Sequence, residues 1–468
     1  MAQATGEALA FATVRELGRR LRSGETTPTA LAEFFIDRLE TVGRRFNAVV
    51  TITRERAMRD ARLAEAELAA GYDRGPLHGI PYGAKDLLAT VGAPTTWGVA
   101  PLREQTFSAD ATVVTRLRDA GAILVAKLGM VELAGGMGYN QPNASLTGPG
   151  ITPWNDQAWS GGSSSGSGSA VGSGSVPFAI GSETWGSILT PSSYCGLSGL
   201  RPTYGRVSRH GAMALSWTLD KLGPMCHSAD DCGLVLDAIA GPDPADPTTI
   251  PSTYRYAPER DRGDGFRLGV LRDGLDGAQP EVRANFEASL QVLGQIASLE
   301  DVVLPDLPYN EATRIIMNAE AAAAYEELVE SGIVADLTAP EDRTGGYART
   351  VLPAVDYLRA LRIRRHIGVA LDDLFARYDG IVCPTTAVVA SPLDMNFNDY
   401  AGRVRRLPIG GAGNVAGLPA ISVPNGVGER GLPTALQVVG RAGAENQILA
   451  VARAYQARTD WHRRQPAL

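Results

Sequence analysis

The chain has 468 residues, of which 44% are hydrophobic and 20% are charged, and its formal net charge is −7. This composition is typical of a globular protein with one large domain or two to three smaller ones. The mild acidity, without a basic stripe, argues against nucleic acid as a partner. No apolar run approaches the roughly 20 residues that a membrane-spanning helix needs.

Cysteine and histidine usage points to a cytoplasmic protein without a metal centre. The N-terminus has no basic region followed by an apolar stretch and a cleavage site, so no secretory signal is predicted. The four cysteines fit no zinc spacing and are expected to be reduced and mostly buried: Cys195, Cys226, Cys232 and Cys383. The five histidines form no cluster with ligand spacing, so no metal site is expected.

The first 130 residues alternate helical and strand-like patterns. Apolar residues recur at helical spacing after Thr27-Pro28, and a lysine, Lys85, directly follows the short strand-like piece that begins at Ile80. Helices are predicted at 28–42, 54–70 and 111–120, and a short buried strand at 122–127. A helix, a glycine and a strand in this order favour parallel strand pairing.

The stretch from Trp159 to Arg209 begins as an almost pure glycine and serine tract. Composition alone would make this tract a flexible linker. However, an apolar run at 176–180 has the length of a buried strand, and the glycines from Gly196 to Gly205 are typical of tight turns. We therefore expect ordered chain in which small residues permit close backbone packing.

The remainder of the chain continues the interleaved pattern without an internal repeat. Helices are predicted at 228–240, 280–298, 310–332, 353–376 and 445–458, with Ser228 as an N-cap. Strands are predicted at 266–271, 301–305 and 380–386, and a strand pair around a turn at 416–424 and 432–440. The whole chain is expected to form one large α/β unit.

The residues for nucleophilic catalysis are present, but the ordinary histidine base is not. Serines are plentiful, while no GxSxG motif surrounds Ser187 and the nearest histidine, His210, lies 23 positions further on. A lysine can act as the base if burial lowers its pKa. Lys85 is a candidate, although a surface or ion-paired lysine is the alternative interpretation.

Three blocks carry a resemblance to a known family: GIPYGAKD (79–86), WSGGSSSGS (159–167) and GSETWGSILTPSSYCGLSGLRPTYGRVSRHGAM (181–213). They resemble, in order and over nearly the whole chain, the amidase signature family. The resemblance implies a single α/β domain over 1–468, with a mostly parallel, twisted mixed sheet of about ten or eleven strands sandwiched by helices. Within it, 1–70 would supply N-terminal helices, 71–241 the catalytic motifs, 242–412 a variable substrate-side region and 413–468 the last strands and helix.

The resemblance also implies a Ser–cisSer–Lys catalytic unit. By motif, Lys85 is the base, Ser163 is the bridging serine in a cis peptide with Gly162, and Ser187 is the nucleophile. Ser164 would support this network by hydrogen bonding. Backbone N–H groups of the loop would form the oxyanion hole, and its residues are Thr184, Trp185, Gly186 and Ser187. This chemistry needs no cofactor and no metal.

Three residues of the third block depart from the family's usual GTDTGGSIR. Trp185 replaces a glycine, Glu183 stands where aspartate is usual, and Leu189 replaces the arginine. The Trp185 indole either lines the substrate pocket or packs inward, and the backbone would be strained if this position required a positive φ. Loss of the arginine argues against an anionic substrate.

Candidate substrate-binding residues are Gly136, Met137, Tyr139 and Trp185. Ile315, Met317 and the segment 394–406 could shape a substrate entrance, and the arginines of this segment could equally be a solvated cluster: Arg403, Arg405 and Arg406.

The predicted function is hydrolysis of the C–N bond of a small, uncharged amide, with anilides, carbamates and esters also possible because they share the acyl-enzyme chemistry. The alternatives are the glutaminase (A) subunit of a tRNA-dependent amidotransferase and a catalytically inactive scaffold. The expected partner is a small-molecule amide, without nucleic acid or membrane, for a cytoplasmic monomer or homodimer.

Overall fold

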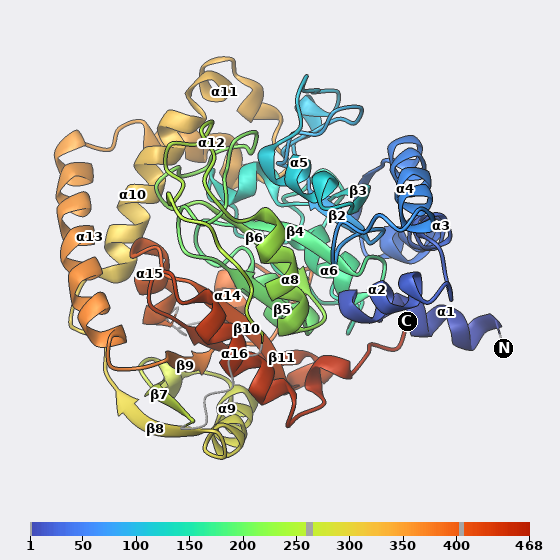
Figure 1. The fold of residues 1–468 in the computed structure, drawn as a ribbon. Coiled ribbons are helices and arrows are strands. Elements are labelled where there is room, and N and C mark those ends of the chain that lie inside the picture. The colour runs from blue at the N-terminus through green and yellow to red at the C-terminus, as the bar shows by residue number, and fades with distance from the viewer. Residues whose placement is uncertain (1, 259–264, 402–406) are drawn as a thin grey trace.

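A computed structural model describes residues 2–258, 265–401 and 407–468. They form a single α/β domain around an eleven-stranded sheet with the order β1-β3-β2-β4-β6-β5-β10-β11-β9-β7-β8 (Figure 1). The strands are β1 Val49–Ile52, β2 Pro81–Lys85, β3 Ile123–Leu128, β4 Phe178–Glu183, β5 Ser198–Arg201, β6 Lys221–Cys226, β7 Phe266–Leu271, β8 Ala297–Val302, β9 Gly380–Pro384, β10 Ala420–Val427 and β11 Pro433–Val439. The expected fold class and strand number are confirmed.

The strand directions correct one expectation, because the sheet is mixed and not mostly parallel. Four of the ten strand pairs described are parallel, namely β2 with β3 and β4, and β7 with β8 and β9. The other six are antiparallel. Short connections such as the one between β10 and β11 can only join antiparallel neighbours, whereas parallel pairs need long crossovers.

Helices cover both faces of the sheet (Figure 1). They are α1 Ala2–Ala10, α2 Val14–Arg22, α3 Pro28–Arg38, α4 Arg54–Ala69, α5 Thr112–Asp119, α6 Ser165–Gly172, α7 Leu189–Cys195, α8 Ala229–Ile239, α9 Pro280–Leu293, α10 Tyr309–Ala324, α11 Glu326–Glu330, α12 Pro340–Arg349, α13 Ala354–Phe375, α14 Phe397–Ala401, α15 Pro408–Val415 and α16 Glu445–Gln456. In β4, Phe178 and Ile180 belong to one hydrophobic core and Ala179 to another. Alternate side chains of the strand thus fill two cores, one on each face.

Local signals account for several helix starts. The Thr27 side chain caps α3 by accepting a hydrogen bond from the Ala30 N–H, and Pro28 occupies the first turn. Ser228 caps α8 in the same way through the Asp231 N–H. Among the described residues, no helix has the length and apolar character needed to cross a membrane. All four cysteines are buried free thiols, as expected.

Two predicted helices and one predicted strand have different bounds in the structure. The helix predicted at 280–298 stops at Leu293, and β8 begins at Ala297, before the predicted strand at 301–305. The strand was misplaced because β8 is an edge strand with exposed polar residues, so its pattern lacks a buried apolar run. The helix predicted at 310–332 breaks at Tyr325, whose buried hydroxyl donates to the carbonyl of Leu133.

The glycine and serine tract is ordered and buried, so it is not a linker. Every residue of α6 is buried, and this helix packs against α7. A Cβ at Gly166 would lie 2.3 Å from the backbone nitrogen of Gly129, so only glycine permits this close approach. The tract therefore brings the segment around Ser163 against β2 and β4, which α6 contacts.

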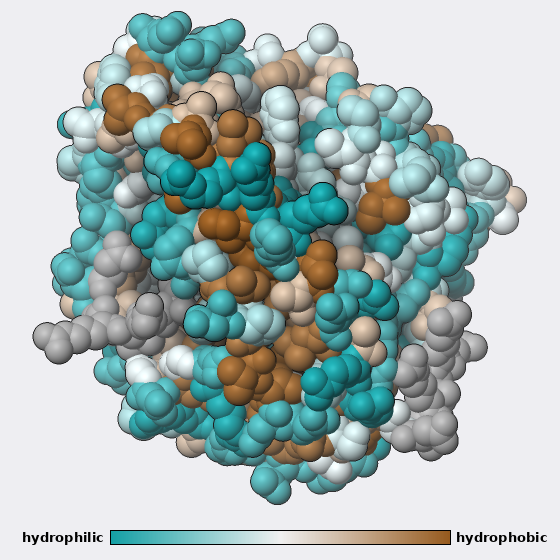
Figure 2. All heavy atoms as spheres, turned by 90° about the vertical axis from the view of Figure 1, so that its left-hand side faces the viewer, coloured by the Kyte–Doolittle hydropathy of each residue, from teal (hydrophilic) through white to brown (hydrophobic). Residues whose placement is uncertain are grey.

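The face that carries α13 is partly apolar, as Figure 2 shows. Val351, just before α13, and three side chains on the helix are more than half exposed: Val355, Leu358 and Val369. Exposed apolar groups gathered on one face are typical of surfaces that contact other molecules.

A buried ion pair joins β3 to the residue that follows β2. Lys127 Nζ lies 2.9 Å from a carboxylate oxygen of Asp86, and both side chains are fully buried. The other oxygen of Asp86 accepts hydrogen bonds from the N–H and hydroxyl of Thr96. We expect Lys127→Met to lower the free energy of unfolding by about 3–5 kcal/mol, because it leaves an uncompensated buried carboxylate.

Urea denaturation followed by circular dichroism would measure this change. The double variant Lys127→Met/Asp86→Asn removes both charges and is expected to recover part of the stability. A double variant no more stable than the single one would contradict this account of the pair.

Candidate active site

Lys85 is the last residue of β2, which lies between β3 and β4 and runs parallel to both. Its side chain is fully buried. Its Nζ lies 2.7 Å from the hydroxyl oxygen of Ser163 and 2.9 Å from that of Ser182, which is in β4. The structure thus brings together the predicted base and the predicted bridging serine, which lie 78 positions apart in the chain.

Burial lowers the pKa of Lys85 to about 7. The negative charges of Asp220 and Glu183 act in the opposite direction and offset only part of this shift. Desolvation dominates because the hydrogen-bond partners of Nζ are neutral hydroxyl groups that provide no compensating charge. Near neutral pH a substantial fraction of Lys85 is therefore the free amine, which can accept a proton.

Lysine is rare in this chain, and every lysine is buried. Only Lys85, Lys127 and Lys221 occur in the sequence, and burial lowers the pKa of each of them. Lys127 pairs with Asp86, whereas the Nζ of Lys221 donates to the side-chain oxygen of Asn414 at 2.8 Å. No lysine therefore contributes to the exposed surface.

Ser163 follows a cis peptide bond with Gly162, as the family resemblance implies. Its side chain is buried, and its carbonyl accepts a hydrogen bond from the Val131 N–H at 3.0 Å. Ser164 supports the same region, because its hydroxyl donates to the Ser182 carbonyl at 3.2 Å and accepts from the Ser182 N–H at 3.3 Å.

Ser187 lies half-buried in the loop between β4 and α7 and lines a cavity. Its carbonyl accepts a hydrogen bond from the Ser164 N–H at 3.4 Å, so the two serine segments run side by side. Within the described residues its hydroxyl has no hydrogen bond to Ser163. Catalytic hydrogen bonds are often long in free enzymes and tighten when substrate binds.

The loop keeps glycine where the backbone requires it. Gly186 has a φ of +95°, whereas Trp185 is not among the described residues with positive φ. The tryptophan that replaces a family glycine therefore causes no backbone strain of this kind. In the described structure the N–H groups of Gly186 and Ser187 donate to no protein acceptor, which leaves them available to a developing oxyanion.

Glu183 holds the loop at both ends. One carboxylate oxygen accepts from the N–H groups of Ile188 and Leu189 at 2.9 and 3.0 Å. The other accepts from Arg201 at 2.9 Å and from Asn414 at 3.1 Å. Burial opposes ionisation of Glu183, but the charges of Arg201 and Lys221 outweigh it and hold the carboxyl pKa below its ordinary value.

The first N–H groups after the loop are not available to an oxyanion. The helix α7 does follow the loop, but its first N–H groups are taken by Glu183. Stabilisation of an oxyanion thus falls to the loop N–H groups themselves.

A cavity of about 370 Å³ opens over this loop. Many of its walls are aromatic: Tyr139, Trp159, Trp185, Tyr194, Phe397 and Tyr400. The ring of Phe397 stacks on that of Trp159 with centroids 5.1 Å apart. Among the described lining residues the only charged side chains are Glu183 and Arg201, which pair with each other.

The structure separates the predicted substrate-binding residues into two groups. Tyr139 and Trp185 line the cavity, as do Met317 and part of the 394–401 segment. Gly136 and Met137 are not among the described residues of its wall. Gly136 packs against Tyr325, and Met137 is buried against α12. Arg403, Arg405 and Arg406 lie outside the described residues.

Sequence reasoning missed two residues of the site. Ser182 was not distinguished from the surrounding serines, although its place one residue before Glu183 at the end of β4 sets it beside Lys85. Asp220 accepts a hydrogen bond from the Thr184 hydroxyl at 2.5 Å, and 36 positions separate the two residues. A prediction that β2 and β4 are parallel neighbours could have located Ser182, because it places the ends of the two strands side by side.

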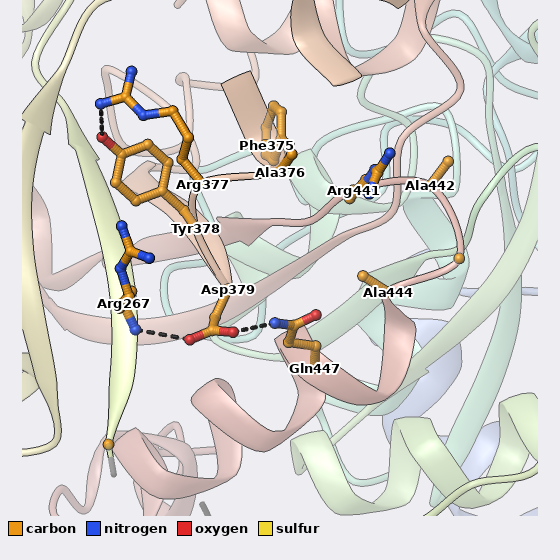
Figure 3. A pocket seen from close by; sticks show the side chains of 12 residues that line it. Arg267, Phe375, Ala376, Arg377, Tyr378, Asp379, Arg441, Ala442, Ala444 and Gln447 are labelled. Atoms are coloured by element: carbon orange, nitrogen blue, oxygen red, sulfur yellow. Dashed lines mark hydrogen bonds between the residues drawn. The ribbon is translucent and has the colours of Figure 1, made fainter. Parts of the chain in front are cut away.

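A surface groove of about 700 Å³ is separate from this site (Figure 3). It lies between β7, the end of α13 and the start of α16, and none of the predicted site residues is among its described walls. Its charged groups are largely paired, since Arg441 binds the carboxylate of Asp372 and Arg377 that of Glu300.

Comparisons with known proteins agree with the geometry. The family model Amidase matches residues 30–449, so the chain belongs to the amidase family, whose enzymes act on C–N bonds. The chain is similar to a subunit of the glutamyl-tRNA(Gln) amidotransferase of Moorella thermoacetica, with 36% identity over 98% of this chain and 99% of the relative.

Solved structures of the same family superpose closely. The native peptide amidase from Stenotrophomonas maltophilia has 30% identity and a TM-score of 0.82, covering 96% of this chain and 97% of its own. A structure described as a vestigial protein complex that reveals the origins of an s-triazine catabolic enzyme also has 30% identity, with a TM-score of 0.86 and coverage of 96% and 98%.

The scarcity of lysine allows a direct measurement of the Lys85 pKa. Labelling lysine with ¹³C at Cε would give three signals, and Lys85→Arg would assign one of them. We expect the Lys85 signal to titrate with a midpoint near pH 7. We expect Ser182→Ala to lower this midpoint by about half a unit to one unit, because an acceptor worth about 1 kcal/mol to the ammonium is lost.

Ser182→Thr keeps the hydroxyl group and serves as the matched control. A Lys85 midpoint above pH 9, or the same shift in both Ser182 variants, would contradict the description of this site.

Proposed function

We propose that this chain is a serine-dependent amidase that cleaves the C–N bond of a small, uncharged amide through an acyl-enzyme on Ser187. The observation that carries the proposal is the buried Lys85 amine, with a pKa of about 7 and a hydrogen bond of 2.7 Å to Ser163. A neutral amine in this position can activate a serine nucleophile without histidine.

The proposed proton path runs from Ser187 through Ser163 to Lys85. Neutral Lys85 accepts the Ser163 proton while Ser163 accepts the proton of Ser187, whose oxygen attacks the amide carbonyl. The carbonyl oxygen becomes the oxyanion and binds N–H groups of the 184–187 loop, of which those of Gly186 and Ser187 donate to no protein acceptor in the described structure.

Collapse of the tetrahedral intermediate breaks the C–N bond. The proton stored on Lys85 returns through Ser163 to the leaving nitrogen, so an amine departs and the acyl group stays on Ser187. Water, activated by the same relay, then hydrolyses the ester and restores the Ser187 hydroxyl.

The cavity supports the substrate class. Its aromatic walls favour apolar or aromatic groups, and the mutual pairing of Glu183 and Arg201 leaves no unpaired charge among its described walls. The Trp185 side chain reaches α15 across the cavity, since a Cβ at Gly410 would lie 3.8 Å from the indole nitrogen. Anilides, carbamates and esters that fit this space would follow the same path.

A second candidate function is that of the glutaminase subunit of a tRNA-dependent amidotransferase. The observation that favours it is the 36% identity to the glutamyl-tRNA(Gln) amidotransferase subunit of Moorella thermoacetica over nearly both chains. Partner subunits and a tRNA would then take part, and the expectation of a small-molecule partner without nucleic acid would not hold. The partly apolar face of α13 would be available to a partner chain.

Turnover of a panel of primary amides, anilides, aryl carbamates, esters and glutamine tests the two functions. We expect aromatic and apolar amides to be hydrolysed and Ser187→Ala to lower kcat by at least about 10³-fold, because the nucleophile is lost. Product formation is followed by chromatography, with Ser173→Ala as a control serine in the tract outside the relay.

The second function would be favoured if glutamine is the only member of the panel to react and ammonia is released only after partner subunits are added. Activity that survives Ser187→Ala would show that the nucleophile is another residue.

The pH dependence of kcat/KM tests the role of Lys85. Below its pKa of about 7 the ammonium cannot accept a proton, whereas above it the free amine can. We therefore expect kcat/KM to fall about tenfold per pH unit below pH 7 and to reach a plateau above it. Lys85→Arg stays charged at every pH and is expected to be inactive throughout. If a variant without Lys85 is active and its kcat/KM still falls in the same way below pH 7, this role of Lys85 is contradicted.

A further inference from the structure

Two buried polar atoms in the wall of the active-site cavity have no hydrogen-bond partner among the described residues. They are the indole nitrogen of Trp159, a residue that is 4% exposed, and the hydroxyl oxygen of Ser391, which is 2% exposed. Both residues line the cavity that Ser187 also lines. A buried polar group without a partner is uncommon, because leaving it unsatisfied is costly.

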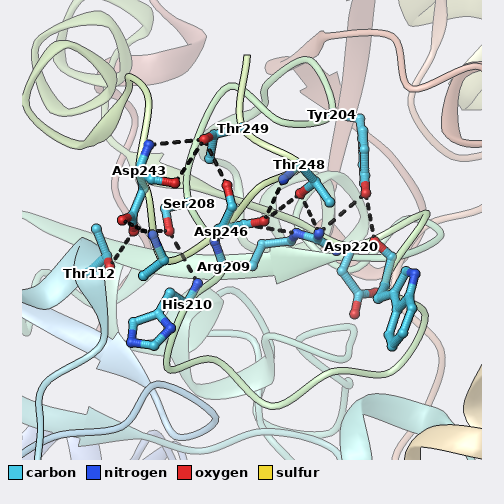
Figure 4. A network of polar contacts seen from close by, with 12 residues as sticks. Thr112, Tyr204, Ser208, Arg209, His210, Asp220, Asp243, Asp246, Thr248 and Thr249 are labelled. Atoms are coloured by element: carbon cyan, nitrogen blue, oxygen red, sulfur yellow. Dashed lines mark hydrogen bonds and ion pairs between the residues drawn. The ribbon is translucent and has the colours of Figure 1, made fainter. Parts of the chain in front are cut away.

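Figure 4 shows how this protein accommodates a buried polar side chain outside the cavity. Asp246 is 6% exposed, and its carboxylate accepts from the Arg209 N–H at 2.8 Å and from the Thr248 hydroxyl at 2.6 Å. Protein groups thus satisfy this side chain, as is usual for buried polar atoms. Trp159 and Ser391 lack such partners where a substrate would bind.

One further side-chain atom of the described wall is buried and unpaired, but its surroundings differ. This atom is Nη2 of Arg201, and a Cβ at Gly413 would lie 2.7 Å from it, so it faces the backbone of α15. Another nitrogen of the same guanidinium binds Glu183 at 2.9 Å. Trp159 and Ser391 are therefore the neutral side chains of the described wall whose polar atoms are buried without a partner.

The two residues lie side by side, and the indole is held in place. The backbone N–H of Trp159 donates to the Ser391 carbonyl at 2.8 Å. The ring of Phe397 stacks on the indole, and the ring of Tyr139 meets it edge-on with centroids 6.1 Å apart. A donor whose orientation is already fixed loses little conformational entropy when it binds an acceptor.

The nitrogen-bearing side of the indole lies close to the proposed relay. A Cβ at Gly162 would lie 2.8 Å from Cζ2 of Trp159, and a single ring carbon separates Cζ2 from the indole nitrogen. Gly162 lines the cavity and is bonded to Ser163. A substrate that occupies the cavity and presents its carbonyl to Ser187 can therefore bring a second polar group to Trp159.

The chemistry of the two side chains favours a neutral acceptor. An indole N–H can only donate, and a serine hydroxyl can donate as well, so the two lone pairs of one carbonyl oxygen could accept from both. Solvent in a cavity of about 370 Å³ can satisfy both atoms before a substrate binds. A substrate that displaces this solvent loses affinity unless it replaces the hydrogen bonds. Glu183 and Arg201 already pair with each other, so the wall offers no counter-charge to an ionic group.

We propose that the Trp159 N–H and the Ser391 hydroxyl bind a neutral oxygen acceptor of the substrate. The preferred substrates are then amides that carry a second carbonyl or ether oxygen besides the carbonyl that Ser187 attacks. This inference rests on the proposed amide hydrolysis and adds a polar contact to a site whose other described walls are largely aromatic and apolar.

Pairs of substrates with the same shape test the proposal. Ring-substituted benzamides and ring-substituted acetanilides carry either an acetyl or an isopropenyl group at the same position, and only the acetyl group can accept a hydrogen bond. We expect an acetyl amide to have a higher kcat/KM than its isopropenyl partner. We expect Trp159→Phe and Ser391→Ala each to reduce this preference about fivefold, because each removes one donor.

Matched variants outside the cavity serve as controls. The indole nitrogen of Trp154 donates to the Cys195 carbonyl at 2.9 Å, and Trp154 is not among the described walls of the cavity. Trp154→Phe and Ser173→Ala are expected to keep the wild-type preference. If Trp159→Phe or Ser391→Ala leaves every preference unchanged, or lowers both members of each pair equally, the proposal is overturned.

Equilibrium dialysis of the same substrate pairs with the Ser187→Ala protein provides a readout that needs no turnover. We expect the acetyl amide to bind more tightly than its isopropenyl partner, and the added change Trp159→Phe to remove most of this difference. Equal binding of both members of every pair would contradict the proposal. If the wild type hydrolyses none of the amides while binding of an acetyl amide still depends on Trp159, the proposed function fails but the acceptor site stands.

Discussion

The site depends on a lysine amine held in the interior between two hydroxyl groups. Removing an ammonium from water is costly unless an anion compensates for it. The two nearest sources of negative charge, Asp220 and Glu183, are engaged elsewhere: Asp220 accepts from Thr184 and from backbone N–H groups, and Glu183 pairs with Arg201. Lys85 therefore avoids the cost by becoming neutral. Had either carboxylate bound Nζ directly, as Asp86 binds Lys127, the amine would stay charged and could accept no proton.

The same polar network fixes the loop that carries the nucleophile. Glu183 ends β4, and its carboxylate joins the first N–H groups of α7 to Arg201 in β5 and Asn414 in α15. The loop is thus attached to α7 and β5, which follow it directly in the chain, and to α15, where Asn414 lies 231 positions beyond Glu183. The Gly186 and Ser187 N–H groups keep no protein acceptor in the described structure. Preorganised donors of this kind need no reorganisation when charge develops, which is the main electrostatic advantage of an oxyanion hole.

The sequence could predict those parts of the site that belong to short, local motifs. The order of the blocks identified the family, the placement of Lys85 and Ser163, and the cis bond before Ser163, because each follows from a short run of residues. Contacts between distant segments could not be read in this way. Ser182 reaches Lys85 only because β2 and β4 are parallel neighbours, and Glu183 takes the α7 N–H groups only because the loop folds back on itself. Met137 lies in the predicted segment but turns into the core, since a loop position alone does not fix side-chain direction.

The departures from the family motif form one connected change at the cavity. Leu189 stands where the family motif has an arginine, and Arg201, the arginine among the described cavity walls, is neutralised by Glu183. A substrate that enters therefore meets no unpaired charge among the described walls, whereas a zwitterionic substrate would need one of each sign to replace its hydration. Trp185 adds an aromatic surface in place of a family glycine, so recognition rests on shape and apolar contact. Such a pocket discriminates poorly between substrates that differ by a methylene group, because one methylene group changes the binding free energy by only about 1–3 kcal/mol. Selectivity among amides must then come from contacts beyond the acyl pocket.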